Sequence, residues 1–147
     1  MREKHVFGPF EHRASTMLQR ADLELYGINH FRPSYVALVY FNADVDVEGA
    51  TEDHDGYAGS FTIFGHGRCT GDLGHCEVHP HARRFDDRPS HPLTRAFKRV
   101  VVTEALRKCL ASTELTITVI VSSDPEDEIE SGDPLLDIEG MQLTTFG

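Results

Sequence analysis

The sequence predicts a mainly β protein, an antiparallel β-sandwich that carries one short helix. Five to seven short segments alternate apolar with polar residues or are rich in β-branched and aromatic residues. A single short segment has a helical pattern, and the chain shows no internal repeat. The 147 residues fit one domain. Many strands with little helix are typical of a sandwich.

The first part of the chain contains two predicted strands. Residues 1–16 have no clean period, so we expect an arm or linker ahead of a domain that spans residues 17–147. Residues 17–29 roughly alternate and predict a strand, which Arg32-Pro33 interrupts. Residues 35–41 are dense in β-branched and aromatic side chains and predict a buried strand.

An acidic segment and a long irregular segment flank the next predicted strand. Residues 44–55 contain many carboxylates and are expected to form a solvated loop. Residues 57–64 alternate as a strand does, with Tyr57 and Phe64 expected in the core. Residues 65–95 show no sustained period, and such long excursions from a compact domain are usually functional or disordered.

The last third of the chain supplies further strands. Residues 98–102 predict one strand, and residues 113–121 alternate strictly, with Leu115, Ile117, Val119 and Val121 expected to face inward. Residues 135–146 predict one or two more.

The helical pattern covers residues 103–110. Thr103 suits an N-cap, and Glu104 is favourable in the first turn because it complements the helix dipole. Cys109 lies within this pattern and is expected to be a small buried apolar residue.

Composition excludes two broad classes of function. The formal net charge is −10, and Asp86-Asp87 interrupt the one basic segment, whereas nucleic-acid binding needs clustered Lys and Arg. No tract is long and apolar enough to cross a membrane, and the first residues lack the apolar stretch of a secretory signal. We therefore expect a soluble, cytoplasmic protein. The oligomeric state is not predicted.

Histidines and cysteines gather in one segment, from His66 to His81. Imidazole and thiolate groups suit copper and zinc. An extended backbone would place His79 and His81 on one side. The spacing matches no standard zinc finger, and loop histidines in an acidic protein are often ordinary surface residues. The candidate metal ligands are His66, Cys69, His75 and Cys76, with His79 and His81 in second place.

The two cysteines of this segment leave several alternatives open. Cys69 and Cys76 could form a disulfide, bind a soft metal or remain buried thiols, and a reducing cytosol disfavours the disulfide. Cys76 could also be a nucleophile beside His75 or His79, although residues adjacent in sequence seldom have the required geometry. The chain has neither a Gly-x-Ser-x-Gly motif nor a glycine-rich phosphate loop.

Ordered motifs across residues 35–121 resemble a known family. The segments are Tyr57-Ala58-Gly59-Ser60-Phe61-Thr62-Ile63-Phe64-Gly65-His66-Gly67, Cys69-x-Gly71-Asp72-x-Gly74-His75-Cys76, Phe85-Asp86-x-Arg88-Pro89-x-His91-Pro92-Leu93-Thr94 and Lys98-Arg99-Val100-x-Val102-Thr103-Glu104-Ala105-Leu106. They resemble the region that follows the copper domain in bacterial tyrosinase-family proteins. More distantly, the order of elements is similar to the β-sandwich of molluscan hemocyanin units.

The resemblance implies a β-sandwich that shields a dinuclear copper site, and in some members cysteines of this region assist copper loading. The family's oxidase centre needs six histidines on a four-helix bundle, which this chain lacks, so it cannot be a dinuclear-copper tyrosinase by itself. We expect a stand-alone accessory domain that binds copper, a tyrosinase-like partner, or both, with zinc as the less favoured metal. One alternative is a small metal-dependent or metal-free enzyme of specialised metabolism that reuses the sandwich. The other is a purely structural module.

Overall fold

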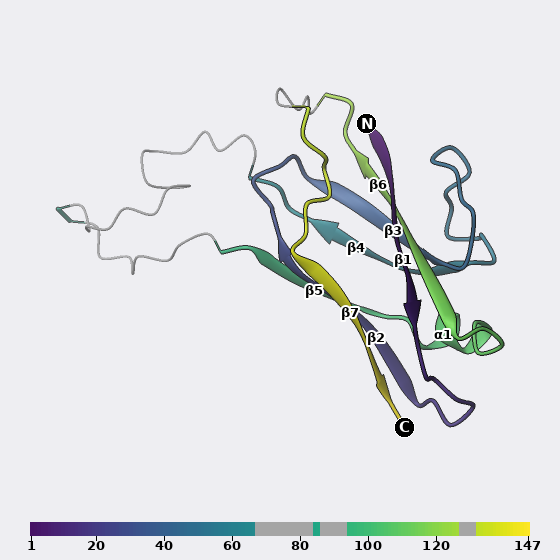
Figure 1. The fold of residues 1–147 in the computed structure, drawn as a ribbon. Helices are drawn as coiled ribbons and strands as arrows, with labels where there is room; N and C mark the ends of the chain where they lie inside the picture. The colour runs from purple at the N-terminus through teal and green to yellow at the C-terminus, as the bar shows by residue number, and fades with distance from the viewer. Residues whose placement is uncertain (67–83, 86–93, 127–131) are drawn as a thin grey trace.

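Two antiparallel sheets and one short helix make up the described part of the chain, which confirms the predicted fold class (Figure 1). The structure is a computed structural model, and it describes residues 1–66, 84–85, 94–126 and 132–147. The elements, in chain order, are β1 (Arg2–Glu11), β2 (Arg20–Ile28), β3 (Tyr35–Phe41), β4 (Tyr57–Ile63), β5 (Ala96–Val101), α1 (Thr103–Lys108), β6 (Glu114–Ser123) and β7 (Gly140–Phe146).

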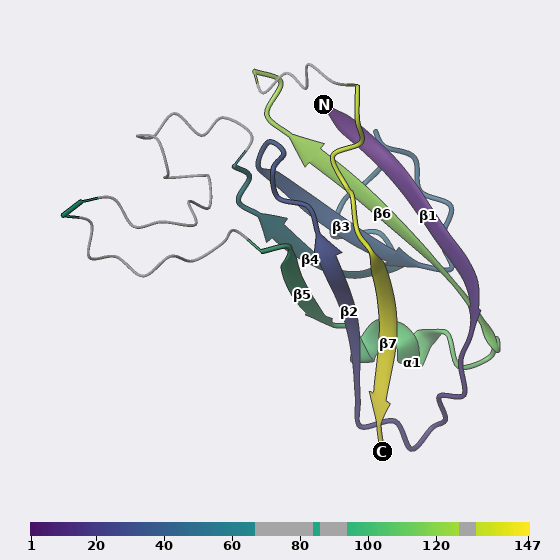
Figure 2. The ribbon, with the colours of Figure 1, turned by 60° about the vertical axis from the view of Figure 1, so that its left-hand side comes forward.

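The strands divide into a four-stranded and a three-stranded sheet, called here sheet A and sheet B. Sheet A has the order β1-β6-β3-β4 and sheet B the order β5-β2-β7. Figure 2 shows the two sheets as separate layers, with the chain termini at opposite ends of the sandwich. Because strands that are neighbours in a sheet are often far apart in the sequence, most contacts that hold the fold join residues distant in sequence.

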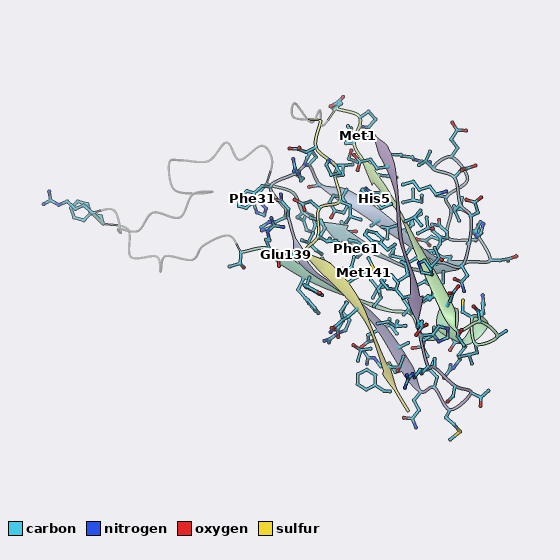
Figure 3. The ribbon with its side chains drawn as sticks, in the orientation of Figure 1. Met1, His5, Phe31, Phe61, Glu139 and Met141 are labelled. Carbon is cyan, nitrogen blue, oxygen red and sulfur yellow. The ribbon has the colours of Figure 1, made fainter. Side chains whose placement is uncertain are left out.

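The core lies between the inward faces of the two sheets. Leu115, Ile117, Val119 and Val121 of β6 are all buried, as their strict alternation predicted. They face Leu23 and its neighbours in β2, and Phe61 and Met141 lie between the layers (Figure 3). Full burial of each such aliphatic side chain contributes about 1.5–3 kcal/mol to folding.

The N-terminal segment is a strand and not the expected arm or linker. Arg2–Glu11 pairs along β6, with His5 opposite Val119 and a register shift between Phe7 and Phe10. The residues of β1 that turn partly inward include Glu3 and His5, so the segment lacks apolar alternation. Glu3 is accommodated there because its carboxylate accepts a hydrogen bond from the Leu135 amide, at 2.8 Å.

The acidic loop after β3 is largely exposed, as expected, and its few apolar residues also cover part of the outer face of sheet A. Tyr40, Val45 and Ile120 form a second buried cluster beneath it. The Tyr40 hydroxyl donates to the Thr51 carbonyl at 2.9 Å, which attaches the loop to the sheet. Tyr57 packs partly against this cluster. Phe64, expected in the core, is 80% exposed because the last inward position of β4 is Ile63.

Helix α1 is shorter than predicted and begins differently. Val102 occupies the N-cap position, and Thr103 is the first helical residue. The Thr103 hydroxyl accepts a hydrogen bond from the Ala21 amide at 3.0 Å, so it links the helix to β2 and does not cap it. Ala105 and Leu106 are buried against the core. None of the helical segments in the described ranges is long and apolar enough to span a bilayer.

Candidate metal centre

Four core strands begin or end at the same end of the sandwich, which we call the His30 end. It comprises residues 29–34 after β2, residues 64–66 after β4, residues 94–95 before β5 and residues 137–139 before β7. Phe31 and Glu139 lie there in Figure 3. The antiparallel pairing of β3 with β4 and of β2 with β5 brings these segments together although they are distant in sequence.

His30 is the central side chain of this end. It is 8% exposed, and each ring nitrogen has a partner. Nε2 lies 2.7 Å from the carbonyl oxygen of Thr94, and Nδ1 lies 2.9 Å from Nδ1 of His66. Phe31 stacks beside the ring with 5.3 Å between centroids. His30 thus contacts the residues on both sides of the segment from 67 to 93.

Backbone contacts hold His66 against His30. The His66 amide donates to the His30 carbonyl at 2.7 Å, and the Gly65 amide donates to the Ser34 hydroxyl at 2.9 Å. A Cβ at position 65 would overlap the Arg32 carbonyl oxygen. Glycine is therefore required where the chain leaving β4 passes the turn after β2, and this close approach sets the position of His66.

Hydrogen bonds and ion pairs join the other segments at the His30 end. Asn29 donates to the Asp137 carboxylate at 3.0 Å. Arg95 donates to the Gly27 carbonyl at 3.0 Å and lies 3.5 Å from a carboxylate oxygen of Glu139. Ion pairs as exposed as this one contribute about 0–1 kcal/mol each. Together, these hydrogen bonds and the ion pair join the end of β2 and the turn after it to the residues that precede β5 and β7.

One of the six predicted metal ligands can be placed, together with a histidine that we did not predict. His66 lies in the described part and pairs with His30, whereas Cys69, His75, Cys76, His79 and His81 lie outside the described residues. Within the described part of the chain there is no group of three or more His, Cys, Asp or Glu side chains suited to a metal. The two histidines contact each other, and two side chains are too few to make such a group by themselves.

His30 escaped the sequence analysis because it lies 36 residues from His66, outside the histidine-rich segment. The usable signal was its place between the end of a predicted strand and the break at Arg32-Pro33. Such a position lies at an end of the sheet, where loops meet. It could not reveal which other loop His30 contacts.

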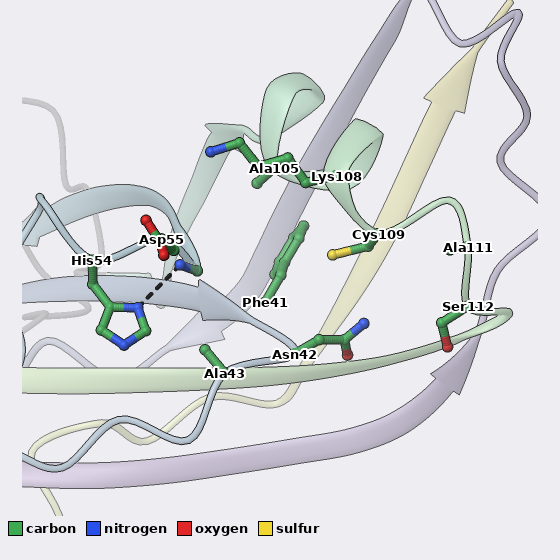
Figure 4. Close-up of a pocket in the computed structure, with 11 residues that line it drawn as sticks. Phe41, Asn42, Ala43, His54, Asp55, Ala105, Lys108, Cys109, Ala111 and Ser112 are labelled. Carbon is green, nitrogen blue, oxygen red and sulfur yellow. Dashed lines mark hydrogen bonds between the residues drawn. The ribbon is translucent and has the colours of Figure 1, made fainter.

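A pocket of about 400 Å³ lies at the opposite end of the sandwich, between the loop after β3 and α1 (Figure 4). Cys109 and His54 are among the residues that line it. Cys109 is half-buried and packs against the core, and burial raises the pKa of its thiol. Nδ1 of His54 accepts a hydrogen bond from the Gly56 amide at 3.0 Å. A thiol that stays protonated at neutral pH is a poor nucleophile, so this pocket offers less chemistry than the His30 end.

Comparison of the chain with protein-family models, curated protein sequences and solved structures finds no significant match. The resemblance to the tyrosinase family remains a prediction from the sequence motifs.

Proposed function

We propose that this chain is a copper-binding accessory domain, with its metal site at the His30 end, that serves a tyrosinase-like copper protein. The observation that carries the proposal is the pair of Nδ1 atoms of His30 and His66, 2.9 Å apart, at the start of the histidine- and cysteine-rich segment. Imidazole nitrogen is a preferred ligand of copper and zinc. The sequence motifs favour copper between these two metals.

The His30 ring has one feature that metal-binding histidines share. In metal-binding histidines, the N–H of the ring nitrogen that does not bind the metal usually donates a hydrogen bond to a carbonyl or carboxylate, which orients the ring. His30 has this arrangement, because Nε2 faces the Thr94 carbonyl while Nδ1 faces His66. Further ligands proposed from the sequence alone are Cys69, His75 and Cys76, followed by His79 and His81.

Copper titration of the purified chain tests the binding half of the proposal. We expect one equivalent of copper to bind in competition with a chelator, and binding to be lost when His66, Cys69, His75 and Cys76 are all replaced by alanine. The matched control is His12→Asn, which lies after β1 at the far end of the sandwich and keeps an acceptor for the Ala14 amide. Equal copper binding by the fourfold variant and the wild type would contradict the ligand assignment.

Co-expression tests the partner half. If a neighbouring gene encodes a four-helix copper domain, the two products should co-elute on size exclusion, and copper-loaded chain should activate that domain in its metal-free form. Turnover of a phenol or catechol by the copper-loaded chain alone would instead favour the enzyme alternative. Absence of copper binding by the folded wild type would refute the proposal.

A further inference from the structure

Strand β7 forms an open edge of sheet B. In the described part of the chain it pairs with β2 only, in continuous register along its whole length. The Ala21 carbonyl accepts a hydrogen bond from the Val102 amide at 2.8 Å, so Ala21 and every second residue after it direct their backbone groups toward β5. Met141, Leu143 and Thr145 of β7 lie opposite these residues. Because the direction alternates along an antiparallel strand, these three residues point their N–H and C=O groups to the open side.

The edge formed by β7 lacks the features that hinder pairing at other edges of the sandwich. The edge strand β1 has a register shift and contains Pro9, which has no N–H to donate. The edge strand β5 carries the charges of Lys98 and Arg99. By contrast, β7 has no charged residue, no proline and no register shift. An uncharged and regular edge is a template on which another strand can pair.

An apolar groove of about 170 Å³ opens beside β7. It lies between Met141 and Leu143 of β7 and Phe10 at the end of β1, with Leu115 and Ile117 of β6 between them. A cavity of about 150 Å³ accommodates a benzene ring. The groove therefore has room for one aromatic or branched aliphatic side chain.

Sheet B is one strand shorter than sheet A on the side where this groove opens. On the other side β4 contacts β5 so closely that a Cβ at Gly59 would overlap Val100. Counted from there, the fourth strand of sheet A is β1, whereas sheet B ends at its third strand, β7 (Figure 2). Leu135, whose amide donates to Glu3, covers the beginning of β1. A segment added beside β7 would therefore lie opposite the end of β1 and cover the groove.

We propose that β7 binds an extended segment of a partner protein as an antiparallel fourth strand of sheet B, with one apolar side chain of that segment in the groove. The residue opposite Leu143 would supply this side chain, since opposed residues of an antiparallel pair lie on the same face. In such recognition the main-chain hydrogen bonds provide affinity and the pocket provides specificity. The proposal goes beyond the proposed function, because it involves neither histidine of the His30 end.

Charge favours a segment with a basic residue over a second copy of this chain. Glu11 and Glu114 lie opposite each other beside the groove, and both are exposed without an ion pair to any described residue. Opposed like charges destabilise a strand pair, so a lysine or arginine next to the inserted side chain would relieve the repulsion. A second copy has a net charge of −10, and its β7 has no basic residue. Twofold pairing of β7 with its copy would also place the copy's sheet A where β1 lies.

Two variants of Leu143 separate the contribution of the strand edge from that of the groove. Leu143→Pro removes an outward N–H and leaves the ladder with β2 intact, whereas Leu143→Phe keeps the backbone and fills part of the groove. The matched control is Val101→Pro, because Val101 is exposed on the other edge of sheet B and its N–H also points away from β2. Thermal melting verifies folding. Since Leu143 is only partly buried, Leu143→Phe remains informative if Leu143→Pro does not fold.

Selection of random peptides displayed on phage, with the full chain as bait, tests the proposal. We expect enriched peptides to alternate apolar and polar residues beside a lysine or arginine. They should bind the wild type and Val101→Pro equally, and each Leu143 variant at least about tenfold more weakly. In amide exchange measured by NMR, an enriched peptide should slow exchange at Met141, Leu143 and Thr145, whose N–H groups point to the open side in the chain alone.

Three outcomes would overturn the proposal. The first is that no peptide is enriched, and the second is that either folded variant of Leu143 binds the enriched peptides as tightly as the wild type does. The third is a wild-type dimer that Leu143→Pro dissociates, which analytical ultracentrifugation would detect and which would make a second copy the occupant of the edge. Each outcome leaves copper binding at the His30 end untouched.

Discussion

Tyr35 and Tyr40 lie in the same strand, and removal of their hydroxyl groups should change stability in opposite directions. Tyr35 is 2% exposed, and its hydroxyl has no hydrogen-bond partner among the described residues. An unpaired buried polar group costs about 1–3 kcal/mol. Tyr35→Phe removes that cost and keeps the ring against Phe61, so we expect the free energy of unfolding to rise by about 1 kcal/mol.

Tyr40→Phe is the matched control. Tyr40 is also buried, but its hydroxyl donates to the Thr51 carbonyl at 2.9 Å. Loss of one such hydrogen bond costs about 0.5–1.5 kcal/mol. In a domain of this size 1 kcal/mol moves the melting temperature by about 2–4 °C, so calorimetry should show Tyr35→Phe melting above the wild type and Tyr40→Phe below it. A loss of stability in Tyr35→Phe equal to that in Tyr40→Phe would refute the reasoning.

The burial of Tyr35 also predicts how the stability of the protein changes at alkaline pH. Burial, with smaller effects from the charges of Asp137 and Glu3, raises the pKa of Tyr35 above its ordinary value of 10.0. Above pH 10 the unfolded chain releases this proton while the folded chain keeps it, so the free energy of unfolding falls as pH rises, by about 1.4 kcal/mol per pH unit for one group. Urea unfolding from pH 9 to 12 should give a shallower fall for Tyr35→Phe than for the wild type. Equal slopes would show that Tyr35 ionises in the folded state.

Three further predictions concern other parts of the sandwich. Leu23→Ala in the core should lower the free energy of unfolding by about 2–5 kcal/mol in urea titration, and a loss below 1 kcal/mol would contradict its complete burial. Asn42 has a φ of +46°, and its side chain hydrogen-bonds to the backbone of Thr116 and Glu114. Asn42→Gly loses these hydrogen bonds but adopts a positive φ easily, whereas Asn42→Ala loses the hydrogen bonds and is also strained at this φ, so Asn42→Ala should melt at the lower temperature. The reverse order would show that φ is unimportant there. In a chain with serine at both other cysteines, alkylation of Cys109 should be slow at pH 8 and accelerate with an apparent pKa above 9, because burial disfavours the thiolate; rapid reaction at pH 7 would contradict this.

Local patterns predicted most of the strands because an inward-facing residue recurs at every second position of a half-buried strand. Tyr35–Phe41 forms the strand expected at those residues, and β6 faces inward with the predicted residues. The prediction failed at β1, where partly buried positions hold polar side chains such as Glu3. It also failed at Phe64, because alternation does not show where a strand ceases to face the core.

The sequence alone determined the fold class, one member of the candidate site and the residue types from which a metal site could be built. Those properties depend on the period of apolar residues and on side-chain chemistry, and both are local. The tertiary structure decided the pairing of β1 with β6, the placement of the acidic loop over sheet A and the contact between His30 and His66. The physical reason is that strand order brings together residues 36 apart in sequence, and no local period encodes which loops meet at the end of a sandwich.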